Sequence, residues 1–192
     1  MPFTEKTLKK WRKRKVPTVF DSSPLIYLTR IGFLDYALKA YQDVYIPEGV
    51  KTEVVDTGMQ IRRPDAFILD EYIKNGKIKV KKIENINSYK ILSKNPLIHK
   101  ADVEAICLAE EKGSILVMDD LKSIEAARLR GITVEPTLTV IIICYALDYI
   151  DFKKAEYSYK ELLKTQFRVK ASVYERALTL LNTIKDWKSM KE

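Results

Sequence analysis

The chain has 192 residues, 46% of them hydrophobic and 31% charged, which is enough for one globular domain with a buried core. Its two cysteines and single histidine exclude a disulfide framework, a cysteine-rich zinc site and a histidine-cluster metal site. No apolar run approaches the roughly 18 residues of a membrane span, and the N-terminus has no apolar signal segment. We therefore expect a cytoplasmic protein with no membrane partner.

The net charge of +8 is concentrated at the two ends of the chain. Residues 1–15 carry seven Lys or Arg and one Glu, residues 151–192 carry ten basic and six acidic residues, and residues 16–150 are slightly acidic. Basic ends favour a polyanionic partner such as RNA, although a Lys-rich surface can also serve solubility alone. We divide the chain into a basic N-terminal arm (1–15), a central domain (16–150) and a helical C-terminal extension (151–192).

Strand and helix patterns alternate along the chain. Strands are predicted at 16–20, 43–46, 77–83 (an edge strand), 115–118 and 132–134. Helices are predicted at 5–15, 22–31, 33–41, 48–56, 64–75, 99–112, 121–130, 137–149, 155–163 and 173–184. Hydroxyl caps are expected at Ser22-Ser23 and Thr137, and Gly32 and Gly113 follow helix ends. This alternation predicts an α/β fold with a mainly parallel sheet covered on both faces.

Two predicted strands end in acidic residues, at Asp21 and at Asp119-Asp120. The carboxyl ends of parallel strands are where open α/β sheets bind ligands. On the helix 99–112, Asp102 falls within the apolar face, whereas Glu104 falls in a charged sector. We therefore expect Asp102 to point inward and Glu104 to point to water, with helix capping as the alternative role for Asp102.

Glu53 borders the buried side of its short helix, although a solvated helix residue is the simpler interpretation for Glu53 alone. Four converging carboxylate positions without His or Cys suit a hard cation, Mg²⁺ or Mn²⁺, bound through oxygen ligands. A metal would also reconcile an acidic centre with a phosphate-bearing partner, and such a site hydrolyses phosphodiesters.

Four segments resemble the PIN domain, and more narrowly its DUF3368 branch, over roughly residues 16–145. They are VFDSSPLI at 19–26, IPEGVKTEV at 46–54, HKADVEAICLA at 99–109 and LVMDD at 116–120. The resemblance implies a three-layer α/β/α fold and a nuclease that depends on Mg²⁺ or Mn²⁺. Many such proteins are VapC-type toxin ribonucleases paired with an antitoxin.

The resemblance also implies a role for each acidic residue. Asp21, Asp102 and Asp120 would hold a metal that activates water, and Glu53 would position that water or a second ion. The implied metal ligands are Asp21, Glu53, Asp102, Asp119 and Asp120, and Ser23 matches the small polar residue that supports the first Asp.

The chain departs from the branch at two places. It has Ala101-Asp102 where Gly-Glu is usual, so the third ligand is one methylene shorter, and it has Pro136-Thr137 where Gly-Thr is usual. The basic arm and the C-terminal extension lie outside the resemblance. The extension is open to three roles: covering a sheet edge, binding a partner, or forming a homodimer.

The main prediction is a metal-dependent ribonuclease that acts on RNA, with a toxin role as one option. The alternative is a non-catalytic nucleic-acid-binding or scaffold protein that keeps the fold. Transfer through an aspartyl phosphate is disfavoured, because the acidic pair follows a later strand here rather than the first. Cys107 and Cys144 lie among apolar residues and are expected in the core, while His99 is expected at the surface.

Overall fold

The computed structural model describes residues 4–14, 16–41 and 43–191, so residues 1–3 and 15 of the predicted basic arm lie outside the described residues. Within the described part, one parallel sheet has the strand order β3-β2-β1-β4-β5. The strands are β1 (Thr18–Phe20), β2 (Val44–Pro47), β3 (Lys79–Lys81), β4 (Ile115–Val117) and β5 (Val134–Glu135). The predicted α/β fold is confirmed, and β3 lies at an edge as expected.

The register of the central strands determines where the acidic segments meet. Phe20 of β1 pairs with Val117 of β4, and the Asp21 backbone N–H donates to the Val117 carbonyl at 2.9 Å. The chain therefore leaves β1 and β4 at the same level, and Asp21 emerges beside the segment that carries Asp119 and Asp120.

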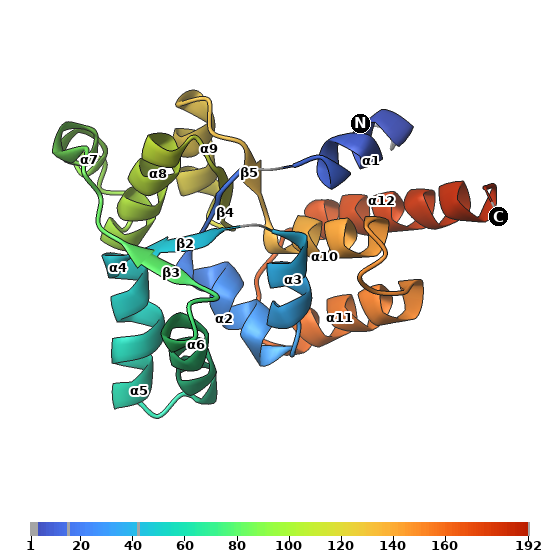
Figure 1. Cartoon of the computed structure of the whole chain (residues 1–192), viewed down its shortest axis with the longest axis horizontal. Helices are drawn as coiled ribbons and strands as arrows, with labels where there is room; N and C mark the ends of the chain where they lie inside the picture. The colour runs from blue at the N-terminus through green and yellow to red at the C-terminus, as the bar shows by residue number, and fades with distance from the viewer. Residues whose placement is uncertain (1–3, 15, 42, 192) are drawn as a thin grey trace.

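Helices cover both faces of the sheet (Figure 1). α8 contacts β1, β2 and β4 on one face, while α2, α3 and α10 pack against one another on the other. The helical elements are α1 (Glu5–Arg12), α2 (Ser22–Arg30), α3 (Leu34–Ala40), α4 (Glu48–Lys51), the π-helical η1 (Thr52–Thr57), α5 (Gly58–Gln60), α6 (Pro64–Lys74), α7 (Ile86–Leu92), α8 (Lys100–Lys112), α9 (Leu121–Leu129), α10 (Thr137–Ala146), α11 (Phe152–Lys164) and α12 (Ala171–Ser189).

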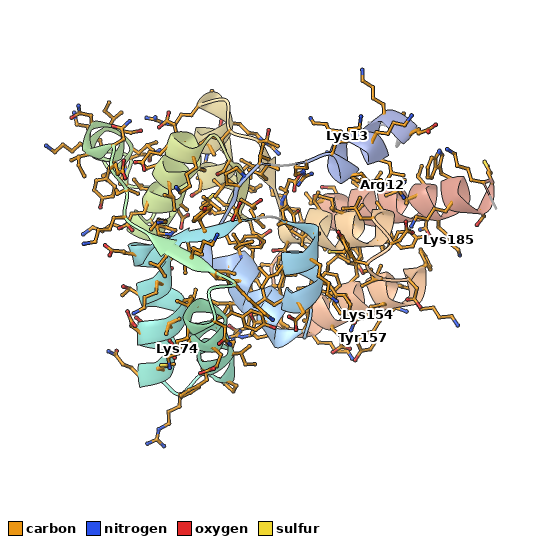
Figure 2. The ribbon with its side chains drawn as sticks, in the orientation of Figure 1. Arg12, Lys13, Lys74, Lys154, Tyr157 and Lys185 are labelled. Carbon is orange, nitrogen blue, oxygen red and sulfur yellow. The ribbon has the colours of Figure 1, made fainter. Side chains whose placement is uncertain are left out.

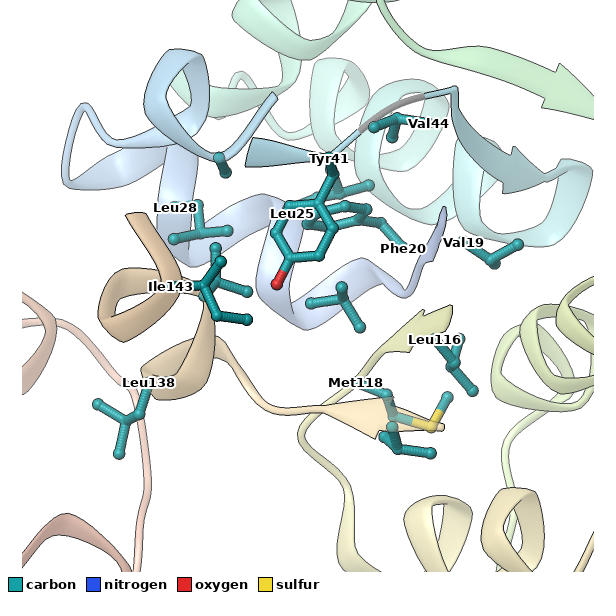
Figure 3. Packing of buried hydrophobic residues seen from close by; sticks show 14 of the residues in the cluster. Val19, Phe20, Leu25, Leu28, Tyr41, Val44, Leu116, Met118, Leu138 and Ile143 are labelled. Atoms are coloured by element: carbon teal, nitrogen blue, oxygen red, sulfur yellow. The ribbon is translucent and has the colours of Figure 1, made fainter. Parts of the chain in front are cut away.

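The core forms where these layers meet (Figure 3). Strand residues Val19, Phe20 and Leu116 are fully buried, as expected for strands covered on both faces. The Phe20 ring meets Tyr41 edge-on, with ring centroids 5.6 Å apart. The predicted burial of Cys107 and Cys144 is confirmed, and His99 is exposed as predicted.

Several element predictions differ from the structure. The helix predicted at 48–56 continues to residue 60 as α4, η1 and α5, and the chain then turns at Arg62, whose φ is +56°. α7 was not predicted, because residues 84–98 carry no strong periodicity. The last strand lies at Val134–Glu135 rather than 132–134. The first residue of α2 is Ser22 and its N-cap is Asp21, without a side-chain cap bond, so the predicted serine cap is wrong.

The two basic ends of the chain lie together. Arg12 of α1 and the following Lys13 lie at the same end of the molecule as Lys185 of α12 (Figure 2). Leu8 of α1 is buried, and Lys191 forms an ion pair with Glu5 at 3.4 Å. α11 and α12 both pack against α10. Within the described residues, we find no helix long and apolar enough to cross a membrane.

Candidate active site

Asp21 is the innermost acid of the candidate site. It occupies the N-cap position of α2, directly after β1, and only 3% of its surface is exposed. Its Oδ1 has no hydrogen-bond partner among the described residues, although it is buried. A buried carboxylate oxygen without a partner is costly, so this atom calls for a ligand from outside the chain.

Glu53 approaches Asp21 from the π-helical turn η1. Its carboxylate accepts a hydrogen bond from the Ser22 hydroxyl at 2.6 Å, which links it to the residue next to Asp21. π-helical turns are rare and are frequently found at functional sites. Glu53 is exposed, as expected for a solvated helix residue. The bond from Ser22 nevertheless directs its carboxylate toward the end of β1.

Asp102 points inward from the first turn of α8, as predicted, with 8% of its surface exposed. Its Oδ2 accepts a hydrogen bond from the Ser123 hydroxyl at 2.6 Å. The N-cap of α8 is His99, so the alternative in which Asp102 caps its helix is wrong. Asp102, although one methylene shorter than the usual Glu, therefore reaches Ser123 on α9.

The two acids after β4 have separate partners. Asp119 accepts two hydrogen bonds from Thr137, from the backbone N–H at 2.9 Å and from the hydroxyl at 2.6 Å. Asp120 is the N-cap of α9 and accepts from the Ser123 N–H at 2.8 Å. Thr137 was predicted to cap α10, and that prediction is wrong, because the N-cap is Pro136 and the Thr137 side chain holds Asp119 instead.

Each of the five predicted acids interacts electrostatically with at least one of the others. Burial raises the pKa of Asp21 well above its ordinary value, and the charge of Asp102 raises it further, with smaller contributions from Glu53 and Asp119. Burial likewise raises the pKa of Asp102, and the charge of Asp120 acts in the same direction. Burial also raises the pKa of Asp119, against the two bonds from Thr137. Keeping these carboxylates ionised therefore costs folding free energy.

Glu104 does not point to water, so that prediction is wrong. Its carboxylate accepts a hydrogen bond from the Gly49 N–H at 2.7 Å, at the N-terminus of α4, where a negative charge is favoured. A Cβ on residue 49 would lie 2.8 Å from the Glu104 Oε2. A side chain at residue 49 would displace the Glu104 carboxylate from this bond, and Glu104 serves to join α8 to α4.

A cavity of about 780 Å³ opens beside the acidic pair. Its lining includes Ser23, Asp119 and Asp120 on one side and residues 165–168, between α11 and α12, on the other. Ser23 therefore faces this cavity, while the neighbouring Ser22 makes the hydrogen bond to Glu53. The C-terminal extension thus supplies part of the cavity wall at Asp119 and Asp120, while Asp21, Glu53 and Asp102 do not line this cavity.

The donor chemistry fits a divalent metal. Of the described residues, no three His, Cys, Asp or Glu side chains are gathered closely enough to form a ready-made metal group. Three of the acids instead accept a hydrogen bond from one hydroxyl each. The pairs are Glu53 with Ser22, Asp102 with Ser123, and Asp119 with Thr137. The carboxylate oxygens and the unpartnered Oδ1 of Asp21 are the hard ligands that Mg²⁺ and Mn²⁺ take.

The parallel sheet, its strand order and the acidic residues at its carboxyl edge define an α/β protein of the PIN type. The sequence model of the family DUF3368, a PIN domain, matches residues 17–183, so the chain belongs to this family. PIN domains are typically nucleases and generally use divalent metals. A comparison with curated proteins finds no match.

The family match reaches further than the sequence resemblance, which ended near residue 145. It includes α11 and most of α12, up to residue 183. The segment 165–168, which lines the cavity beside Asp119 and Asp120, lies inside the match.

Sequence reasoning identified the acids but missed the hydroxyl groups that hold them. The pair of Ser123 and Asp102 could not be found from local patterns, because the two residues lie 21 positions apart in the chain. Ser22 and Thr137 could not be found in this way, because their partners lie 31 and 18 residues away.

Proposed function

We propose that this protein is a metal-dependent ribonuclease that hydrolyses phosphodiester bonds of RNA at the site formed by Asp21, Asp102, Asp120, Glu53 and Asp119. The observation that carries the proposal is the buried, unpartnered Oδ1 of Asp21 among further carboxylates. An arrangement that only stabilised the fold would place a cation or a donor there.

In this proposal, Asp21, Asp102 and Asp120 hold Mg²⁺ or Mn²⁺, with Asp119 and Glu53 beside them. The bound metal supplies Lewis-acid polarisation of the phosphate and a water of lowered pKa. The chain's own task is to keep its carboxylates ionised and aimed. The hydroxyls of Ser123 and Thr137 do this, because each donates a 2.6 Å hydrogen bond to an acid whose burial favours protonation.

RNA as the substrate class is supported by the distribution of charge. A cleft of about 770 Å³ beside α1 is lined by Lys6, Lys10 and Lys13, all exposed. Several lysines along one cleft attract a polyanion longer than a single phosphate group.

The direct test is cleavage of labelled single-stranded RNA with Mn²⁺ or Mg²⁺, comparing the wild type with Asp21→Asn. We expect the variant to lose about 10²- to 10³-fold in rate, as when a group aimed at transition-state charge is removed, and EDTA to abolish cleavage. Asp186→Asn is the matched control, because Asp186 is an exposed acid on α12 and should leave the rate unchanged.

Cleavage that survives both Asp21→Asn and EDTA would contradict the proposal. A wild type that binds several RNAs without cutting any would favour the alternative, a non-catalytic nucleic-acid-binding protein that keeps the PIN fold. The toxin role, the antitoxin partner and the homodimer stay predictions from the family resemblance and from the C-terminal helices.

A further inference from the structure

The cavity beside the acidic pair has one cationic residue in its lining. Asp119 and Asp120 line it at the end of β4, and Arg168 lines it from the segment 165–168. Acidic walls alone repel phosphate, so a nucleic acid entering this cavity needs a positive charge near its backbone.

The segment that carries Arg168 is held in place. The Tyr27 hydroxyl donates to the Gln166 carbonyl at 3.2 Å, and the Tyr27 ring meets the buried Phe167 edge-on with centroids 5.2 Å apart. The Thr165 hydroxyl accepts from the Phe167 N–H at 3.1 Å. In Figure 1 this connection between α11 and α12 runs beside α2. Arg168 therefore extends from an anchored backbone rather than from a free loop.

Several other cations of the C-terminal extension already have partners. Lys154 lies over the rings of Tyr36 and Tyr157, Lys185 lies over Phe152 at 4.4 Å, and Lys188 pairs with Asp148. Arg168 is exposed, and we find no ion pair of its side chain among the described residues. Its charge is available to a ligand in the cavity.

We propose that Arg168 binds a backbone phosphate of the RNA and so holds the strand against Asp119 and Asp120. This inference rests on the proposed function, because it names how the substrate of that site is held. A guanidinium suits the task, since its planar fork donates two parallel hydrogen bonds to phosphate oxygens. Arg168 is on this account a substrate-binding residue contributed by the extension.

The test compares Arg168→Ala and Arg168→Lys with Arg176→Ala, which removes an exposed arginine of α12 that does not line the cavity. Binding of a short labelled single-stranded RNA is measured in EDTA, where no cleavage is required, and KM and kcat are measured with Mn²⁺. We expect Arg168→Ala to weaken binding and raise KM by about ten- to a hundredfold, with kcat nearly unchanged.

Two further readouts separate phosphate binding from a structural role. Arg168→Lys should recover part of the affinity, because it keeps the charge but loses the fork. The salt dependence of binding should become shallower by about 0.7 in log–log slope for Arg168→Ala, which corresponds to one phosphate contact on a single strand. Arg176→Ala should change neither quantity.

Wild-type affinity and KM in Arg168→Ala would overturn the inference and leave the ribonuclease proposal standing. If the wild type binds the RNA but cleaves nothing, the ribonuclease proposal fails, and the loss of affinity in Arg168→Ala still decides the role of Arg168. If the wild type does not bind the short RNA even at low salt, both are overturned.

Discussion

Two buried acids of this protein differ in whether a cation compensates their charge. Glu135, at the end of β5, accepts two hydrogen bonds from the Arg14 guanidinium at 2.8 and 2.9 Å and a third from the Tyr41 hydroxyl at 2.7 Å. Asp21, at the end of β1, is equally buried, but its neighbours are other acids and its Oδ1 has no partner among the described residues.

The difference separates a structural acid from a functional one. Arg14 compensates Glu135 and at the same time ties the basic N-terminal arm to the sheet, with its guanidinium 5.5 Å from the centre of the Tyr41 ring. The charge of Asp21 is instead not compensated by a cation. This lowers the stability of the metal-free fold and favours the binding of a cation at the site. Four experiments, from the largest expected effect to the smallest, test this contrast.

Removing the cation from Glu135 should have the largest effect. We expect Arg14→Ala to lower the free energy of unfolding by about 3–5 kcal/mol, because it leaves a buried carboxylate uncompensated. Urea unfolding measures this loss. The matched control is Arg12→Ala, whose partner Asp148 is exposed and whose ion pair should contribute at most about 1 kcal/mol. Equal losses in the two variants would contradict the contrast.

Supplying a cation to Asp21 should come next. At a Mn²⁺ or Mg²⁺ concentration of about 100 times Kd, we expect the wild type to gain about 2.7 kcal/mol, or roughly 5–10 °C in Tm. Thermal unfolding with and without the metal measures the gain. Asp102→Asn should lose most of this gain, because Asp102 is one of the predicted metal ligands. An undiminished gain in that variant would place the metal elsewhere.

Neutralising Asp21 in the metal-free protein should be stabilising. Its pKa is raised in the folded state, so the ionised form costs stability above that pKa and costs nothing below the unfolded value of about 3.9. We expect Asp21→Asn to gain about 1–3 kcal/mol at neutral pH and the gain to vanish as the pH falls toward 4. Denaturant unfolding across this pH range measures it, and a destabilised variant at neutral pH would oppose the explanation.

Removing one of the two hydrogen bonds to Asp119 should have the smallest effect. Thr137→Val removes the hydroxyl donor and keeps the backbone donor, so about 1 kcal/mol of stability should be lost. The lost hydrogen bond had lowered the pKa of Asp119, so the pKa rises in the variant and the acidic limb of the cleavage–pH profile shifts to higher pH. Thr137→Ser, which keeps a hydroxyl, should restore the profile, and an unshifted limb in Thr137→Val would remove Thr137 from the site.

The fold class and the acidic positions could be predicted from the sequence because both follow local rules. Strand ends, helical periodicity and turn glycines are visible within short windows, and they placed Asp21 after β1 and Asp102 on the inner face of α8. The helix predicted at 48–56 was four residues too short, because the sequence pattern did not show that a π-helical turn carries the helix on to residue 60.

The sequence by itself determined which acids this protein carries, the oxygen chemistry they favour, and the parallel sheet that collects them at one edge. Only the tertiary structure decided their partners: Ser123 for Asp102, Arg14 for Glu135, and the segment 165–168 as part of the cavity wall at Asp119 and Asp120. Such pairs join residues that are far apart in the chain, and they depend on the angles and distances between packed elements. Local patterns do not encode those angles, so the same acids could not be sorted into compensated and uncompensated ones before the fold was known.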